Sequence, residues 1–215
     1  MNNSDHYFKK GITFTGAGSK GNSFRYLPEG SIFDTGSRSL FPKKESIDRI
    51  EYLQGYLNSK LASYILDCLN PTVNTTVGDL KRVPFVYKNK EECLLVKELT
   101  IKNIAIIDYC DGFDITNRAA FKTPFDGNLI KENKVRIKTF YNYENHLLTQ
   151  ILINEAIINE KIFEVYDLTE HDKAMVLAKE GVSIGGLPVT SEARDAYLAE
   201  TEATKEFPLD AIREF

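Results

Sequence analysis

A glycine-rich segment near the start of the chain has the side chains of a loop that grips a phosphate. The segment, FTGAGSKGNS, runs from Phe14 to Ser23. A nucleotide-binding P-loop requires G-x-x-x-x-G-K-[ST], and Gly16 and Gly21 have that spacing, but Asn22 stands where the lysine would reach the phosphates. An S-adenosylmethionine loop would need a parallel strand before it and a helix after it, whereas SFRYLPEG follows. We therefore interpret the segment as a loop between strands, with side chains that suit phosphate oxygens and base edges: Ser19, Lys20, Asn22, Ser23 and Arg25.

Further basic and polar residues could act on the same kind of polyanion. Four lysines would position phosphates, namely Lys9, Lys10, Lys43 and Lys44, and Arg38 would join Arg25 as a reader of base edges. A polar turn later in the chain adds the second-rank candidates Asn74, Thr75 and Thr76. The same residues, interleaved with aromatic side chains, also fit a solvated sheet face above an apolar core. Composition alone leaves both interpretations open.

The net charge of −4 is the sum of two regions of opposite sign. Residues 1–44 hold seven Lys/Arg against three Asp/Glu, a net charge of +4. Residues 160–215 hold six basic and thirteen acidic side chains, a net charge of −7. This division indicates that only the first part of the chain meets a polyanion.

Other patterns of reactive residues lack the partners that their chemistry would need. The tripeptide Asn70-Pro71-Thr72 lacks the second proline and the aromatic residue with which amino-methyltransferases hold a flipped adenine, so we expect a helix end there. The three histidines and three cysteines show no zinc spacing, which favours surface imidazoles and buried free thiols. Asp108, Asp111 and Asp114 alternate in a loop-like stretch, where a divalent cation is an alternative to a solvated surface.

The apolar pattern predicts an α+β fold in which short antiparallel strands precede packed helices. Strands are expected over residues 7–15, 23–27 and 31–35, and an edge strand over 80–87, where Pro84 cannot donate to a ladder. Apolar spacings of three and four predict one helix from an N-cap at Ser46 to Leu69. Further helices are expected over 91–109, 144–168 and 172–181, with a Gly-Gly-Leu-Pro turn and a short helix near Ser191 after them.

Two domains are expected: a recognition domain over residues 1–90 and a mainly helical C-terminal region over 91–215 that ends in an acidic tail. No run approaches the roughly 18 to 20 apolar residues that cross a bilayer, and the N-terminus has no apolar signal-peptide core. These features predict a soluble cytoplasmic protein that does not bind a membrane.

Several segments resemble one family in the order in which they occur. They are KKGITFT, SFRYLPEGSIFD, LFPK, YLQGYLNSKLASYILDCLNPTVNTTVGDLKRVP and INEAIINEKIFEVYDLT. They resemble the C-terminal portion of the PglX family, the adenine-specific DNA methyltransferases of BREX phage-exclusion systems, which is similar to type IIG restriction–modification enzymes. The resemblance is densest over residues 8–84. The helix with Asn58, Ser59 and Lys60, the polar turn and the strand after it also resemble the recognition-domain ending of type I specificity subunits.

The resemblance implies a target-recognition module whose partner is double-stranded DNA. In the family, an N-terminal part binds S-adenosylmethionine and carries the Asn-Pro-Pro-Tyr tetrapeptide, and neither motif occurs in these 215 residues. We therefore expect no cofactor and no catalysis in this chain, and a methyltransferase catalytic domain as a second partner. An alternative is a protein-interaction module, in which the acidic helices after residue 145 contact other subunits of a defence complex. A self-sufficient enzyme would require both missing motifs.

Overall fold

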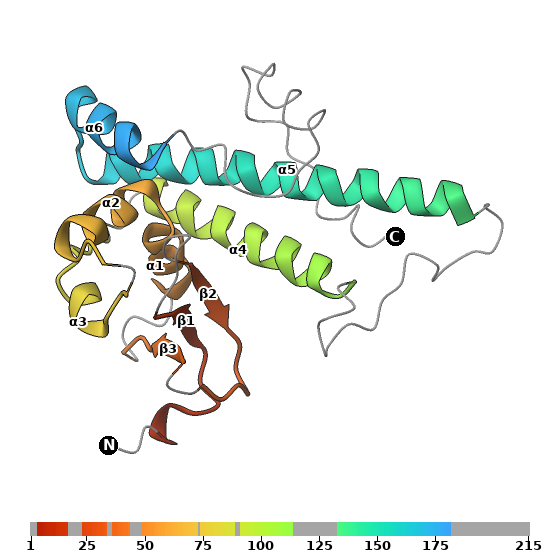
Figure 1. The fold of residues 1–215 in the computed structure, drawn as a ribbon, viewed down its shortest axis with the longest axis horizontal. Coiled ribbons are helices and arrows are strands. Elements are labelled where there is room, and N and C mark those ends of the chain that lie inside the picture. Colours follow the sequence, from red (N-terminus) through yellow and green to blue (C-terminus); the bar gives the residue numbers. More distant parts are fainter. Residues whose placement is uncertain are drawn as a thin grey trace. The chain divides into compact units, whose positions relative to one another are not determined.

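The sheet and the helices of this protein are seen in a computed structural model that describes residues 4–16, 23–33, 36–43, 49–72, 74–88, 91–113 and 133–181. Within these ranges the chain forms one three-stranded antiparallel sheet, six α-helices and a short 3-10 helix at Ser4–His6, as Figure 1 shows. The α+β fold with a helical second part, predicted from the sequence, is confirmed. None of the helices described is long and apolar enough to cross a membrane.

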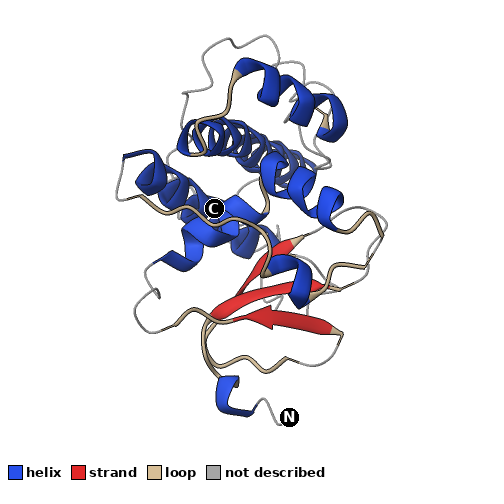
Figure 2. Ribbon diagram, turned by 90° about the vertical axis from the view of Figure 1, so that its left-hand side faces the viewer, coloured by secondary structure: helices blue, strands red, loops and turns tan. Residues whose placement is uncertain are grey.

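The sheet consists of β1 (Gly11–Thr15), β2 (Phe24–Leu27) and β3 (Ser37–Leu40), with β1 in the centre and both neighbours antiparallel to it. Figure 2 shows the three strands side by side. Ile12 and Phe14 of β1 are buried, whereas Thr13 and Thr15 between and after them are more exposed. This period of two gives the sheet one apolar face, which packs against helix α1 (Ile50–Leu57), and one polar face.

The third strand lies six residues later than the sequence predicts. Residues 31–33 are not a strand, because the turn at Pro28–Ser31 folds back on Phe8: the Ser31 amide donates to the Pro28 carbonyl and the Phe8 amide donates to the Ser31 carbonyl. The strand that pairs with β1 is SRSL, whose Ser37 hydroxyl lies 2.7 Å from the Thr13 hydroxyl. Strand formation depends more on an available pairing partner than on the intrinsic propensity of the residues. The free edge of β1 pairs with this segment.

The single helix predicted from Ser46 to Leu69 is two helices, α1 and α2 (Lys60–Leu69). Ser59 between them has extended backbone angles, and its hydroxyl accepts a hydrogen bond from the Ala62 amide at 3.3 Å. Ser59 is thus the N-cap of a new helix, and the apolar spacing continues across the break because both helices bury one face. Ser46 lies outside the described residues.

The strand predicted over residues 80–87 is also wrong. Helix α3 (Val77–Leu80) begins in a capping box between Thr76 and Asp79, and no strand follows it before residue 89. Tyrosine hydroxyls take the place of a strand partner: Tyr56 and Tyr166 donate to the Pro84 carbonyl at 2.7 and 2.8 Å. Tyr52 donates to the Val86 carbonyl at 2.9 Å, and the Val86 amide donates to the Tyr166 hydroxyl at 3.1 Å. The Pro84 carbonyl and both backbone groups of Val86 are therefore satisfied without a sheet.

The three later helices predicted from the sequence are confirmed, with longer bounds. They are α4 (Glu91–Asp111), α5 (Asn133–Val165) and α6 (Glu170–Glu180). Helix α5 begins at Asn133, within a stretch too polar for the sequence to assign. The Gly-Gly-Leu-Pro turn, the helix near Ser191 and the part of the acidic tail after residue 181 lie outside the described residues.

By its contacts the chain divides into two compact units, Met1–Thr100 with Ile158–Ser183, and Ile101–Ile157 with Ile184–Phe215. In the first unit, Gly55 of α1 lies so close to α4 that a Cβ there would be 2.3 Å from the Thr100 hydroxyl. In the second, Ile106, Tyr109, Tyr143, Leu147 and Ile151 form an apolar cluster between α4 and α5. The domain boundary near residue 90 stays a prediction.

Candidate nucleic-acid interface

The polar face of the sheet, here called the outer face, consists of Thr13, Thr15, Arg25, Ser37 and Ser39. The strand register pairs Thr13 with both Arg25 and Ser39, and Thr15 with Ser37, so all five residues share one side of the sheet. The Thr13 and Ser37 hydroxyls are hydrogen-bonded at 2.7 Å, and the Ser39 hydroxyl donates to the Ser37 carbonyl at 3.4 Å. The result is a patch of hydroxyls beside one guanidinium.

Arg25 is the only arginine on the outer face within the described residues. Its side chain is exposed, and one Nη donates to the Thr15 hydroxyl at 2.9 Å. A guanidinium has five N–H donors, so among the described residues the bond to Thr15 leaves further Arg25 donors for an external acceptor. The bond to Thr15 holds the planar group over the sheet, where it could meet a phosphate or the edge of a guanine.

Arg38 lies on the opposite side of the sheet from Arg25. The register places it next to Phe14, on the face that is buried. Its guanidinium packs over Gly16, where a Cβ would be 2.8 Å from the Arg38 Cζ, and one Nη donates to the Thr75 carbonyl. Arg38 thus joins β3 to the polar turn, a contact between elements that the spacing of residues in the sequence does not reveal.

The other predicted DNA-binding residues divide into three groups. Lys9 and Lys43 are exposed, and no described carboxylate lies within salt-bridge distance of either. Lys10 is partly buried and its ammonium lies 3.9 Å from the Glu51 carboxylate. Ser19, Lys20, Asn22 and Lys44 lie outside the described residues.

The polar turn is held together by hydrogen bonds within itself. The Asn70 side-chain amide donates to the Asn74 carbonyl and to the Asp79 carboxylate, each at 2.9 Å. Bonds from Asn70 and Thr76 lower the pKa of Asp79 below its ordinary value. Thr75 is buried and Asn74 is exposed, so of these two predicted contacts only Asn74 presents its side chain to solvent.

The Asn58-Ser59-Lys60 tripeptide positions the sheet and the helices. The Asn58 side chain bonds the backbone of Phe24 in β2, and Ser59 caps α2. The Lys60 amide donates to the Asn159 side chain at 2.7 Å, and its ammonium donates to the Glu180 carbonyl at 2.9 Å. These contacts place the tripeptide in the scaffold of the first unit.

The hydroxyls of the outer face were missed by sequence reasoning. Thr13 and Thr15 alternate with the buried Ile12 and Phe14, and this alternation was the available signal for a polar face. Ser37 and Ser39 could not be found in this way because the third strand was expected earlier in the chain.

The structure supports no metal site in the described part of the chain. Asp108 and Asp111 lie on α4 rather than in a loop, and Asp114 lies outside the described residues. The described residues hold no group of three potential metal ligands. Burial and the nearby Asp111 raise the pKa of Asp108.

The three histidines are exposed, as predicted. Of the free cysteines, Cys93 is buried, Cys110 is half-buried and Cys68 is exposed, so the prediction of buried thiols was wrong for Cys68.

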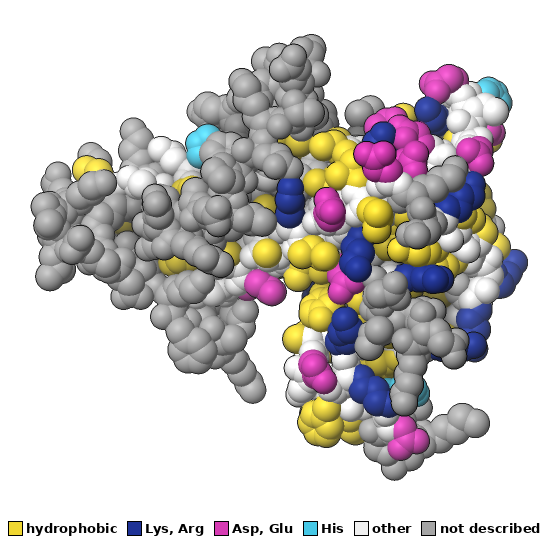
Figure 3. Space-filling model, turned by 180° about the vertical axis from the view of Figure 1, so that it is seen from behind, with side chains coloured by type: hydrophobic (Ala, Val, Ile, Leu, Met, Phe, Trp, Pro, Cys, Tyr) yellow, Lys and Arg dark blue, Asp and Glu magenta, His cyan; other side chains and the backbone are white. Residues whose placement is uncertain are grey.

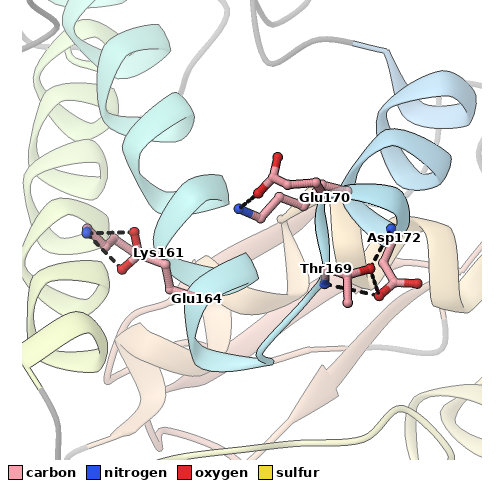
Figure 4. Close-up of polar contacts among 6 residues, drawn as sticks. Lys161, Glu164, Thr169, Glu170 and Asp172 are labelled. Carbon is pink, nitrogen blue, oxygen red and sulfur yellow. Dashed lines mark hydrogen bonds and ion pairs between the residues drawn. The ribbon is translucent and has the colours of Figure 1, made fainter.

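Most of the acidic side chains around the junction of α5 and α6 have local partners. Figure 4 shows the Lys161 ammonium 2.9 Å from the Glu164 carboxylate and the capping box in which Thr169 and Asp172 begin α6. Glu170 pairs with Lys173 at 2.8 Å. In the described part of the acidic region, short-range contacts of the kind that support exposed helices therefore pair these carboxylates.

The chain is similar to an adenine-specific methyltransferase. This relative, BrxX of Escherichia coli O9:H4 (strain HS), is 28% identical over 206 residues, which cover 92% of this chain. The same residues cover 16% of the relative, so the chain spans about a sixth of its length. No protein-family model matches the chain. The similarity to BrxX supports the resemblance to adenine-specific methyltransferases found in the sequence.

Proposed function

We propose that this chain is the DNA sequence-recognition portion of a site-specific adenine-N6 DNA methyltransferase that acts in phage defence or restriction–modification. The observation that carries the proposal is the similarity to BrxX, which extends over almost the whole chain. The outer face of the sheet adds a physical argument, because it brings hydroxyl groups and an exposed guanidinium together on one side of the sheet. Such groups bond to phosphate oxygens and to the edges of bases.

In this proposal the outer face and the loops around it meet the duplex. Arg25 contacts a phosphate or the O6 and N7 acceptors of a guanine, and the threonine and serine hydroxyls beside it accept or donate as the base requires. Lys9, Lys10 and Lys43 contact phosphates and fix the orientation of the protein. Ser19, Lys20, Asn22 and Lys44 extend this contact from the adjoining loops. Asn74 is a second-rank contact, while Arg38 and Thr75 join β3 to the polar turn, since Arg38 bonds the carbonyl of Thr75.

Methyl transfer needs a catalytic domain and S-adenosylmethionine as methyl donor, and we propose that both belong to a partner of this chain. The described residues do not fit an S-adenosylmethionine site. The glycine-rich segment lies between β1 and β2, which are antiparallel, so the strand–loop–helix arrangement that such a site requires is not formed there. The role of this chain in the reaction is to bind duplex DNA and to place the target adenine.

A salt titration of DNA binding tests the proposal. Fluorescence anisotropy of the 215-residue protein with a labelled 30-base-pair duplex should give a dissociation constant that rises steeply with salt, because each neutralised phosphate releases counterions. Arg25→Ala should weaken binding and reduce the slope of log K against log salt by about 1 if Arg25 contacts a phosphate. The matched control is Lys81→Ala, which removes an exposed cation at the end of α3. Absence of binding at low salt would contradict the proposal.

A second function is suggested by apolar side chains on the surface of the helices. Ile101, Ile107, Val135, Ile137 and Tyr141 are exposed hydrophobic residues of the second unit. We propose that these side chains form one patch that contacts another subunit of the defence system, since contiguous exposed apolar patches mark protein contacts. Replacing Ile107 and Tyr141 by serine should then abolish co-purification with that subunit and leave DNA binding unchanged.

A further inference from the structure

Phe8 combines two features that rarely occur together. Its backbone φ is 65°, in the left-handed region that a bulky side chain disfavours, and its side chain is 61% exposed. Within the described residues the only other non-glycine residue with a positive φ is Asp167. Burial of the ring does not explain the conformation of Phe8, because most of the ring faces solvent. Strained residues of this kind occur where the surrounding structure enforces them for a functional purpose.

The surrounding structure fixes the backbone of Phe8 on both sides. The Phe8 amide donates to the Ser31 carbonyl at 2.9 Å, and the Gly30 amide donates to the Phe8 carbonyl at 3.2 Å. Before it in the chain, the ring of Tyr7 packs edge-on against Phe33, with centroids 5.3 Å apart. The turn therefore holds Phe8 in place and turns its ring away from the core. Ile32, which follows Ser31, is 68% exposed and adds a second apolar side chain.

We call Phe8 and Ile32 the apolar tip, and lysines follow Phe8 in the chain. Lys9 and Lys10 follow Phe8 directly, and Lys9 is exposed with no described carboxylate at salt-bridge distance. On the surface drawn in Figure 3, hydrophobic side chains likewise lie among lysine and arginine side chains. Lysine is depleted in the cores of protein–protein interfaces, so this combination does not favour a protein partner. Apolar wedges beside cationic groups are typical of proteins that unstack a base step of DNA.

We infer that Phe8 is an apolar wedge that inserts at a base step of duplex DNA, while Lys9 holds a phosphate beside that step. This inference rests on the proposed function, since a wedge requires that this chain binds duplex DNA. A backbone already fixed by hydrogen bonds presents the ring without first losing its own conformational freedom, which gives the strained conformation at this position a purpose. Unstacking a step costs a few kcal/mol in general, and the cost is least where pairing is already weakened.

The test compares an intact 30-base-pair duplex with the same duplex carrying one abasic site. A wedge fills the gap at an abasic site without unstacking a base, so the wild-type protein should bind the abasic duplex about tenfold more tightly. Phe8→Asn should bind both duplexes equally, because asparagine adopts a positive φ readily and removes the ring without disturbing the turn. Phe8→Tyr should keep the preference. Tyr141→Ala, which removes an exposed aromatic ring from α5, should also keep it.

The outcomes separate the wedge from DNA binding itself. Salt-dependent binding with equal affinity for the two duplexes would overturn the wedge and leave the proposed function standing. A preference that persists in Phe8→Asn would also overturn it, because the preference would then come from another part of the protein. If neither duplex is bound at low salt, both the wedge and the proposed function are wrong. Circular dichroism of Phe8→Asn confirms that the variant is folded before the comparison is made.

Discussion

The Asn58 side chain pairs with the backbone of Phe24 through two hydrogen bonds, as a neighbouring strand would. Its Oδ1 accepts from the Phe24 amide at 2.9 Å, and its Nδ2 donates to the Phe24 carbonyl at 2.8 Å. Gln54, one turn earlier on α1, donates to the same carbonyl at 3.4 Å. The end of α1 is in this way joined to β2, the strand that carries Arg25 on its other face. The Asn58-Ser59-Lys60 tripeptide thus supports the outer face from behind.

Asn58→Ala should destabilise the protein by about 1 to 3 kcal/mol, because two hydrogen bonds are lost and the Phe24 backbone groups are left without these partners. Asn58→Asp keeps an oxygen that accepts from the Phe24 amide but loses the donor to the Phe24 carbonyl. The remaining hydrogen bond should reduce the loss of stability, whereas repulsion between the carboxylate and the Phe24 carbonyl should add to it. The free energy of unfolding from urea titrations measures both. An unchanged denaturation midpoint in Asn58→Ala would show that the pair contributes nothing.

Tyr56 and Tyr166 donate to one carbonyl, and this shared acceptor predicts non-additive effects. Their rings are stacked with centroids 5.1 Å apart, and burial raises the pKa of both hydroxyls. Tyr56→Phe leaves the Pro84 carbonyl bonded to Tyr166 and should cost about 1 kcal/mol or less. Tyr166→Phe should cost more, since the Val86 amide also loses its acceptor.

The double variant should lose about 1 kcal/mol more than the sum of the two single losses, since only then is the Pro84 carbonyl unsatisfied. A double-mutant cycle by urea denaturation measures this difference. Tyr141→Phe, on an exposed side chain, is the control. Strict additivity would mean that water replaces either hydroxyl equally well.

Gly55 should tolerate no side chain while Thr100 faces it. A Cβ at position 55 would lie 2.3 Å from the Thr100 Oγ1 and 3.1 Å from the Val96 Cγ1. Gly55→Ala should therefore destabilise the protein by about 1 to 3 kcal/mol through overpacking, despite the better helix propensity of alanine. Adding Thr100→Ala removes the clashing hydroxyl, so the pair of substitutions should recover part of the loss. If Gly55→Ala is more stable than the wild type in thermal unfolding, the close approach of α1 to α4 is wrong.

Asp79 should make the protein less stable in acid. The side chains of Asn70 and Thr76 and the Thr76 amide donate to its carboxylate and hold its pKa below 3.8. The unfolded chain then binds this proton at higher pH than the folded chain does. The stability that Asp79 contributes is complete above the unfolded pKa and is lost as the pH falls through the folded pKa.

Asp79→Asn removes that titration. The wild type should exceed the variant in stability at pH 6, and the difference should shrink as the pH approaches 2. Urea midpoints of the two proteins across this range provide the measurement. A constant difference would show that the capping box does not depend on the charge of Asp79.

The sequence was sufficient for features set by local patterns. The alternation in β1 and the apolar spacing in α4 to α6 predicted these elements because each reflects one buried face. The break at Ser59 was hidden, since the apolar spacing continues through it, and the absence of a strand over residues 80–87 depends on tyrosines from two distant helices. Arg38 shows the same limit for the site. Only the register with β1 reveals that it lies on the buried face, whereas Arg25 lies on the outer face.

Selection from a pool of duplexes with a randomised central segment tests the central claim most directly. The protein is incubated with the pool at low salt, and the bound duplexes are recovered, amplified and sequenced over several rounds. A recognition module should enrich one short sequence, and Arg25→Ala should relax or abolish that enrichment at the positions that Arg25 reads, while Lys81→Ala should not. Recovery of the starting distribution by the wild-type protein would contradict the assignment of this chain to DNA sequence recognition.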